Sequence, residues 1–460
     1  MEELKHDAEA YLKVPRTISD FSDQVAEESG RDIQYRTCSW QKAACLLFSA
    51  YVCLAILAFP WSYAILGLVP GVLVTICIAA SVQYTSLILW RFCMEHPEVR
   101  SVCDIGRIIS GGQWGYTATA VGFILNNTFI QALECLAGAK LLNTLVASGG
   151  FCTVGYSAIV AILCFILSLP RTLNQLSGLA TFSAVTMGVS VLLAVIFSGI
   201  QSEPFGYIEG EAPLVTAFPV SGTTYVSGML AFLNITHALI GQTTIPSFLA
   251  EMKNPKDFPK ALWAATIGEV VLFIFCGSIM YRYLGNQYVT SPAYGSLQPV
   301  YKKIAFCFAI PSIIYLGSIY ASVSARFIFL RIFDADSKHT HSNTLIGWAT
   351  WVGIIAVTWV FAFILAEIIP FFPQMISTIC SLFNGWFGFI YWAMAYMMLY
   401  PGKSKWAGPK RSLETLFNYF LIVFGLYILI AGTYVSVQSI IDSYHTSEVG
   451  TVFSCASNAI

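Results

Sequence analysis

Eleven apolar stretches, each long enough to cross a lipid bilayer as a helix, follow one another between residues 41 and 441. A spanning helix needs roughly 20 predominantly apolar residues, and a soluble chain carries about 25% charged residues. This chain of 460 residues has 57% hydrophobic and 11% charged residues. The sequence therefore predicts an all-α polytopic membrane protein. The expected spans are residues 42–66, 71–94, 114–140, 154–170, 177–200, 223–249, 259–284, 303–330, 345–368, 372–399 and 414–441.

Two short connectors divide neighbouring spans. Pro70-Gly71 predicts a tight hairpin between the first two spans, and Pro170-Arg171 separates the fourth from the fifth.

Lysine and arginine predict the orientation, because cytoplasmic connectors keep positive charge. If the N-terminus is inside, the 24 basic residues all fall on the cytoplasmic side except Lys140, Arg282, Lys302 and Lys303. We expect a cytoplasmic N-terminus and an extracellular C-terminus at the plasma membrane, with the vacuolar membrane as the alternative.

The chain divides into six predicted segments. Residues 1–40 are rich in acidic residues and are predicted to be a disordered cytoplasmic tail without a cleavable signal. The others are a first five-helix repeat (41–200), an extracellular loop (201–222), a second five-helix repeat (223–400), a cytoplasmic loop with an eleventh helix (401–441) and an extracellular tail (442–460).

Most of the 13 cysteines lie in apolar helices, where they pack as small hydrophobes. The predicted topology places Cys152 and Cys455 outside, where they are able to pair in an oxidising compartment, but no spacing rule decides whether they do.

No pattern of metal ligands, activated nucleophile or phosphate-binding loop is found in the sequence. We expect no catalytic residue, metal site or cofactor, and no nucleic-acid partner. The distinctive chemistry is polar side chains at membrane depth, which are costly there and tend to mark a solute or ion path.

The third predicted span places polar groups along one helical face. Asn127, Gln131, Glu134 and Gly138 follow one another at i, i+4, i+7 and i+11. An ionised carboxylate such as Glu134 near the bilayer centre costs at least ~2.5 kcal/mol unless it is paired or hydrated. The face is either part of a solute path or a hydrogen-bonded interface between helices, with the glycine allowing close approach.

The sixth and first predicted spans carry helix-breaking residues at comparable depth. In the sixth, Asn234, His237 and Gly241 share a face and Pro246 follows, so we expect a break near Gly241. The first span has Pro60 at a matching distance into the segment. Two broken helices five spans apart are typical of inverted repeats in secondary transporters, whose substrate lies between the breaks.

Ser377, Ser381 and Asn384 form a similar polar stripe in the tenth predicted span. We expect this stripe to close the cavity from the outer side.

The segment from Gly241 to Trp263, GQTTIPSFLAEMKNPKDFPKALW, resembles the sixth-span signature of the amino acid/auxin permease family. The chain is most similar to fungal neutral amino acid permeases of the methyltryptophan-resistance type, over residues 36–445. This resemblance implies a LeuT-type fold of the APC superfamily, with two inverted five-helix repeats and one extra helix. It also implies a transporter of neutral aliphatic and aromatic amino acids, coupled to protons or, alternatively, to sodium. A vacuolar transporter and a transport-like amino acid receptor remain alternatives; a membrane-embedded enzyme lacks support.

The resemblance also suggests site residues. The family usually has glycine at the positions of Cys53 and Ala55, so this chain either unwinds without glycine or has a narrower pocket. The expected substrate-binding residues are Val52, Cys53, Leu54, Ala55, Ile56, Asn127, Gln131, Asn234, His237, Ala238, Gly241 and Gln242. The proton-coupling candidates are Glu134, which we prefer, Glu269 and His237. The possible cation site comprises Ser49, Ser322 and Ser324.

Overall fold

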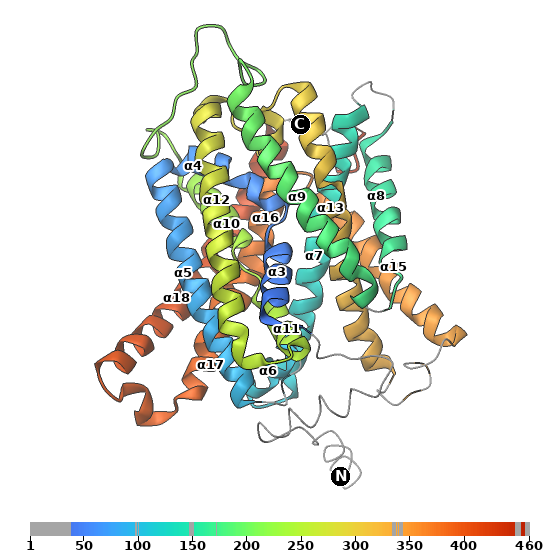
Figure 1. Ribbon diagram of the computed structural model, residues 1–460, viewed down its shortest axis with the longest axis vertical. Helices are drawn as coiled ribbons and strands as arrows, with labels where there is room; N and C mark the ends of the chain where they lie inside the picture. The colour runs from blue at the N-terminus through green and yellow to red at the C-terminus, as the bar shows by residue number, and fades with distance from the viewer. Residues whose placement is uncertain are drawn as a thin grey trace.

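The computed structural model describes residues 38–96, 99, 101–146, 151–171, 173–333, 337, 339, 344–446 and 452–455. These residues form one bundle of helices (Figure 1). Within this part of the chain, β pairing is limited to one isolated bridge between Cys38 and Met252. The predicted disorder of the N-terminal tail falls on residues 1–37, outside the described residues.

Each predicted span coincides with one helix or with a consecutive set of helical segments. The first half comprises α3 (Trp40–Tyr51), η1 (Leu54–Ala58), α4 (Phe59–Leu66), α5 (Leu68–Glu95), α6 (Val102–Ser110), α7 (Gln113–Val146), α8 (Thr153–Leu167) and α9 (Leu173–Ile200). The second half comprises α10 (Tyr225–Ala238), η2 (Gln242–Thr244), α11 (Ile245–Glu251), η3 (Pro255–Asp257), α12 (Phe258–Tyr288), η4 (Ala293–Ser296), α13 (Pro299–Ile332), α15 (Leu345–Ile368), α16 (Phe372–Ile379), η5 (Cys380–Ile390), α17 (Tyr391–Leu399), η6 (Gly402–Trp406) and α18 (Pro409–His445).

The spans differ in length and in whether each consists of one helix or of several helical segments. By length and composition, seven of the described helices are able to span a membrane alone, and the first span does so as a pair bent by 48°. The fourth span, α8, is shorter at 15 residues. The sixth span is built from α10, η2 and α11, and the tenth from α16, η5 and α17.

The hairpin between the first two spans turns at Gly67, so its prediction at Pro70-Gly71 was wrong. Gly67 has φ 80° and ψ 153°, a backbone conformation that favours glycine. Pro70 instead lies in the first turn of α5, where no intrahelical amide bond is lost.

One end of the bundle carries a disulfide between Cys152 and Cys455, which settles the pairing that the sequence left open. We call this end the disulfide end; it also carries the long connection before α10 (Figure 1). Tyr444 Oη donates to the carbonyl of Ile368 at 2.8 Å, so α18 is fastened to α15 near the disulfide.

The opposite end, which we call the basic end, carries Arg91, Arg107, Lys253 and Arg331 on or beside the helix termini. Here the residue pair Cys38 and Met252 forms the isolated bridge, and Lys253 N donates to the carbonyl of Cys38 at 2.9 Å. The segment before α3 is therefore joined to the segment after α11.

Candidate substrate and coupling site

The first span breaks after α3 without the help of glycine. α3 ends at Tyr51, and Cys53 is extended, with φ −120° and ψ −173°. Any residue adopts this conformation. The helix then resumes as η1 and α4. The predicted interruption is therefore present, and the first alternative from sequence, unwinding without glycine, is the correct one.

The sixth span breaks where the sequence predicted. α10 ends at Ala238, Gly241 has φ −145° and ψ 17°, and η2 and α11 follow. Pro60 and Pro246 each lie in the first turn of the α-helix that follows a break. Proline is tolerated there because its missing amide would have no intrahelical acceptor. The two breaks are thus built alike.

The two breaks contact each other directly. Tyr51 Oη donates to the carbonyl of Gly241 at 3.2 Å, and Thr244 Oγ1 donates to the same carbonyl at 2.8 Å. A Cβ atom at Gly241 would lie 1.9 Å from Cε1 of Tyr51. Only glycine allows this approach.

The breaks also leave backbone donors free. The amides of Leu54, Gly241, Gln242 and Thr243 begin short helices and have no intrahelical acceptor. Among the described residues, none of these amides donates a hydrogen bond. Such donors are suited to a carboxylate.

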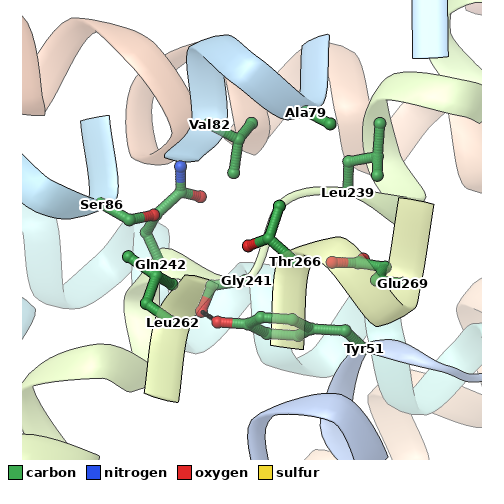
Figure 2. Close-up of a pocket in the computed structure, with 10 residues that line it drawn as sticks. All are labelled: Tyr51, Ala79, Val82, Ser86, Leu239, Gly241, Gln242, Leu262, Thr266 and Glu269. Atoms are coloured by element: carbon green, nitrogen blue, oxygen red, sulfur yellow. Dashed lines mark hydrogen bonds between the residues drawn. The ribbon is translucent and has the colours of Figure 1, made fainter. Parts of the chain in front are cut away.

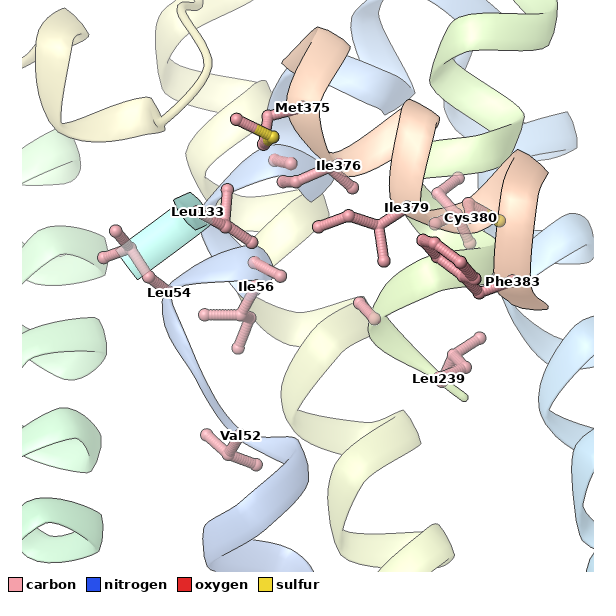
Figure 3. Packing of buried hydrophobic residues seen from close by; sticks show 14 of the residues in the cluster. Val52, Leu54, Ile56, Leu133, Leu239, Met375, Ile376, Ile379, Cys380 and Phe383 are labelled. Atoms are coloured by element: carbon pink, nitrogen blue, oxygen red, sulfur yellow. The ribbon is translucent and has the colours of Figure 1, made fainter. Parts of the chain in front are cut away.

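Apolar side chains gather around the first break. Figure 3 shows Ile56 close to Leu133 of α7 and facing Ile376 and Ile379 of the tenth span, with Phe383 beyond them. All five are at least nine-tenths buried. A solute held between the breaks would meet aliphatic and aromatic surface here.

The polar face predicted on α7 has two parts. Asn127 Nδ2 donates to Ser324 Oγ of α13 at 3.0 Å, and a Cβ atom at Gly138 would lie 2.7 Å from Val160 of α8. These two residues serve the packing of helices. Gln131 Oε1 and Glu134 Oε2 are buried and accept no hydrogen bond from the described residues.

His237 is joined to the tenth span. Asn384 Nδ2 lies 3.1 Å from His237 Nδ1. The amide nitrogen is a donor only, so Nδ1 accepts and this imidazole is neutral. One turn earlier, both polar atoms of the Asn234 amide are buried without a hydrogen-bond partner.

The polar stripe predicted for the tenth span does not exist as one face. Ser377 Oγ accepts from Ser436 of α18 at 3.0 Å, and Ser381 packs against Gly432 of α18. Asn384 faces α10 instead. The reason is that η5 is a π-helix, whose wider turn moves the third residue off the face that α-helical spacing predicts.

A hollow lies beside the sixth-span break, between α3, α5 and α12 (Figure 2). It is narrow, with a cavity volume of about 10 Å³, roughly the room that one water molecule needs. Its apolar lining is Ala79, Val82, Leu239 and Leu262, and its polar lining is Tyr51, Ser86, Gly241, Gln242, Thr266 and Glu269.

Of the two buried carboxyl candidates, Glu269 lines this hollow and Glu134 does not. Each side chain is 3% exposed. Cys53 of the first break lies within electrostatic range of both carboxyls.

The three serines predicted as a cation site are engaged separately. Ser49 Oγ donates to the carbonyl of Cys45 in its own helix at 2.7 Å. Ser322 Oγ donates to the carbonyls of Ser318 and Ser168, and Ser324 accepts from Asn127.

The sequence did not single out Tyr51 and Ser86, which line the hollow, or Gln83, which is hydrogen-bonded to Thr266 of its lining. Gln83 is 4% exposed and accepts from Thr266 Oγ1 at 2.7 Å. A lone amide in the apolar second span was a usable signal for Gln83. Nothing in the sequence distinguished Tyr51 from the other 22 tyrosines.

A bundle whose two broken spans meet at mid-depth defines a membrane transporter of the LeuT type. The solved structure of Mhp1, a nucleobase-cation-symport-1 family transporter in a closed conformation with bromovinylhydantoin bound, shares this fold. The TM-score is 0.54 with 12% sequence identity, covering 89% of this chain and 94% of Mhp1.

The chain belongs to the transmembrane amino acid transporter protein family, whose model matches residues 36–438. The N amino acid transport system protein of Neurospora crassa is 29% identical over 437 residues, covering 94% of this chain and 92% of that protein. A transmembrane transporter of Gibberella moniliformis is 30% identical over 440 residues, covering 95% and 91%. The protein is therefore a multi-pass amino acid transporter.

Proposed function

We propose that this transporter imports neutral aliphatic and aromatic amino acids by proton symport, with alternating access to a site between the first and sixth breaks. The amino acid's carboxylate would bind the free amides at Leu54 and at Gly241 to Thr243. Its ammonium group would meet carbonyl oxygens at the ends of α3 and α10, where the helix dipoles are negative.

The preference for neutral side chains rests on one observation. The surface around the first break is made by Ile56, Leu133, Ile376, Ile379 and Phe383 (Figure 3). An apolar pocket of this kind is favourable for leucine or phenylalanine. It would leave the charge of a lysine or aspartate side chain without a partner.

Proton coupling requires a group that gains and loses charge within the membrane. Glu134 and Glu269 are buried carboxyls that each have an oxygen without a hydrogen-bond partner among the described residues. His237 Nδ1 is already engaged by Asn384, which makes it the weaker candidate.

We also propose that the disulfide end faces the outside of the cell. Disulfides persist on the oxidising side of a membrane, and the positively charged residues gather at the other end. Reduction of intact cells followed by a membrane-impermeant thiol reagent should label Cys152 and Cys455. Labelling only after the membrane is permeabilised would reverse the orientation or indicate an internal membrane.

The deciding experiment is uptake of labelled leucine or phenylalanine into proteoliposomes, with a proton gradient and a sodium gradient imposed separately. We expect accumulation with protons alone. Accumulation with sodium alone would refute the symport mechanism, and binding without flux would indicate a receptor.

A further inference from the structure

In the hollow beside the sixth break, Glu269 shares the lining with hydroxyl oxygens whose hydrogens are already engaged. Thr266 Oγ1 donates to Gln83 Oε1 at 2.7 Å, and Tyr51 Oη donates to the carbonyl of Gly241 at 3.2 Å. Thr266 precedes Glu269 by three positions on α12, so the two side chains are neighbours on one face. Both hydroxyls therefore offer only lone pairs to the carboxyl.

Gln242 presents an acceptor for the same reason. Its Nε2 donates to Thr85 Oγ1 at 3.1 Å and to the carbonyl of Gly388 at 3.4 Å, which engages both amide hydrogens. Thr85 in turn donates to the carbonyl of Val82 at 3.1 Å, so it is able to accept. The network thus fixes the orientation of the amide, and Gln242 Oε1 is left buried without a partner.

A carboxylate has only acceptors, whereas a carboxylic acid has one donor. Glu269 is 3% exposed, and its Oε1 has no hydrogen-bond partner among the described residues; it shares the hollow with acceptors at Thr266, Gln242 and Tyr51. The arrangement therefore suits the protonated acid. In Figure 2 the carboxyl points into the hollow toward Thr266.

In the part of the chain that the structure describes, no charged or titratable group nearby supplies a positive charge that would stabilise an ionised Glu269 in place of the proton. Tyr51 and Cys53 of the first span are in electrostatic range of Glu269, and neither carries positive charge. No salt bridge to Glu269 occurs among the described residues. Of the other elements packed against α12, α9 and η1 contain no ionisable residue. α4, α5 and η4 contribute Tyr63, Tyr84 and Tyr294, which are hydrogen-bonded to Thr75, Asn418 and Ser190. α3 and α5 also contain Cys45, Cys77 and Cys93, which carry no positive charge. The charged residues lie toward helix ends: Lys42, Arg91, Glu95 and Lys256 are exposed, and Asp257 is paired with Lys260 of α12.

We propose that Glu269 takes up and releases the transported proton, in a hollow that adjoins the amino acid pocket at Gly241 and Gln242, and that Tyr51 links this hollow to both breaks. This inference rests on the proposed symport and names its proton-binding residue. The carboxyl forms an O–H bond with a proton taken from water, and that bond breaks when the proton passes to water in the hollow. No other covalent bond changes.

The hollow gives the released proton a direction. It follows α12 from Glu269 back to Leu262, toward the end at which α12 begins. Glu269 lies about 16 Å along the helix from Phe258 at 1.5 Å per residue. Release would therefore be toward the basic end, the cytoplasmic side in the proposed orientation.

Gln83 allows the site to hold either charge state. Its Nε2 has no hydrogen-bond partner among the described residues. A half-turn of this amide would present Nε2 to Thr266 Oγ1 and release the Thr266 hydrogen toward an ionised Glu269. Deprotonation then requires only side-chain rotation.

The test compares Glu269→Gln with Glu134→Gln in proteoliposomes loaded with and without labelled leucine. With a gradient of one pH unit, one-proton symport sustains a concentration ratio of about ten. We expect Glu269→Gln to reduce this ratio to about one while keeping leucine exchange without a gradient, which also shows that the variant is folded. Glu134→Gln should keep pH-driven accumulation.

Two results would overturn the assignment while leaving the symport intact: wild-type accumulation by Glu269→Gln, or selective loss of pH-driven accumulation in Glu134→Gln. If the wild-type protein accumulates leucine only with sodium, the symport proposal itself fails. Sodium dependence that is lost in Glu269→Gln would then mark the hollow as a cation site.

If Glu269→Gln also loses exchange, the variant Gln83→Leu tests whether Glu269 is the proton-binding residue. Without Gln83, the Thr266 hydrogen is free to donate to the carboxylate, which stabilises the ionised form. The pH of half-maximal uptake should then fall by about one unit, the worth of one hydrogen bond. An unchanged pH profile would refute the role of Glu269.

Discussion

The first and sixth breaks have the same plan and opposite chemistry. Both interrupt a span at mid-depth and both are followed by a helix with proline in its first turn. Around the first break the side chains from Leu54 to Ala58 are apolar and at most 2% exposed. Around the sixth, Asn234, His237 and Gln242 bring amides and an imidazole to the same depth.

This difference indicates a division of roles. The first break supplies shape, because its aliphatic residues contact α7 and the tenth span. The sixth supplies hydrogen bonds, because Gln242 reaches α5 and the tenth span while His237 binds Asn384. Tyr51 is where the two meet, since it ends α3 and binds Gly241.

The largest expected effect is on the contact between the breaks. Gly241→Ala places a methyl group 1.9 Å from Tyr51 Cε1. Overpacking costs about 1–3 kcal/mol, or roughly tenfold to a hundredfold in rate. We expect leucine uptake to fall by that factor, measured as kcat/KM.

Two controls sharpen this prediction. Gly353→Ala adds the same methyl group in open space on α15 and should have no effect. Tyr51→Ala in the Gly241→Ala background should restore part of the gradient-independent exchange. Normal uptake by Gly241→Ala alone would show that the two breaks do not need this contact.

A smaller effect is expected where the first break shapes the pocket. Ile56→Ala removes buried aliphatic surface beside Leu133. We expect kcat/KM for leucine to fall about tenfold and the preference to shift toward tryptophan, since methylene-sized differences are worth about 1–3 kcal/mol. Competition between labelled leucine and unlabelled tryptophan measures this shift.

Ile267→Ala is the matched control, because that side chain is 57% exposed on α12. An unchanged preference in Ile56→Ala would mean that the first break does not shape the substrate pocket.

The smallest effect is expected at the position where the family usually has glycine. Cys53 is already extended, so Cys53→Gly needs no new conformation. The substitution destabilises the fold by about 0.5–1 kcal/mol, because glycine loses more conformational entropy on folding. Uptake and its pH dependence should stay within about threefold of wild type. A large gain in rate would show that the missing glycine limits the movement of the first span.

The sequence predicted the architecture well because spans and breaks are local features. Hydrophobic length located the spans, and proline located both interruptions, together with glycine in the sixth span. The hairpin was misplaced because a proline in the first turn of a helix resembles a proline in a loop. Residues 377–384 were misread because α-helical spacing fails inside a π-helix.

The site was harder to predict because it depends on which hydrogens are engaged. The sequence favoured Glu134 over Glu269, because Glu134 lies on a polar face of its span. They differ in the structure because Glu269 lines a hollow together with Thr266, Gln242 and Tyr51, which come from three separate spans, whereas Glu134 does not. The role of either carboxyl remains a prediction.

The disulfide has a consequence for how the protein is made. Cys152 and Cys455 are 303 positions apart, and every helix from α8 to α18 lies between them in the chain. The bond is able to form only after the last span has been synthesised and has placed Cys455 on the same side of the membrane as Cys152. Its presence on a newly made chain therefore reports that insertion is complete, so pulse-labelled protein trapped with a thiol reagent would separate finished molecules from partly inserted ones.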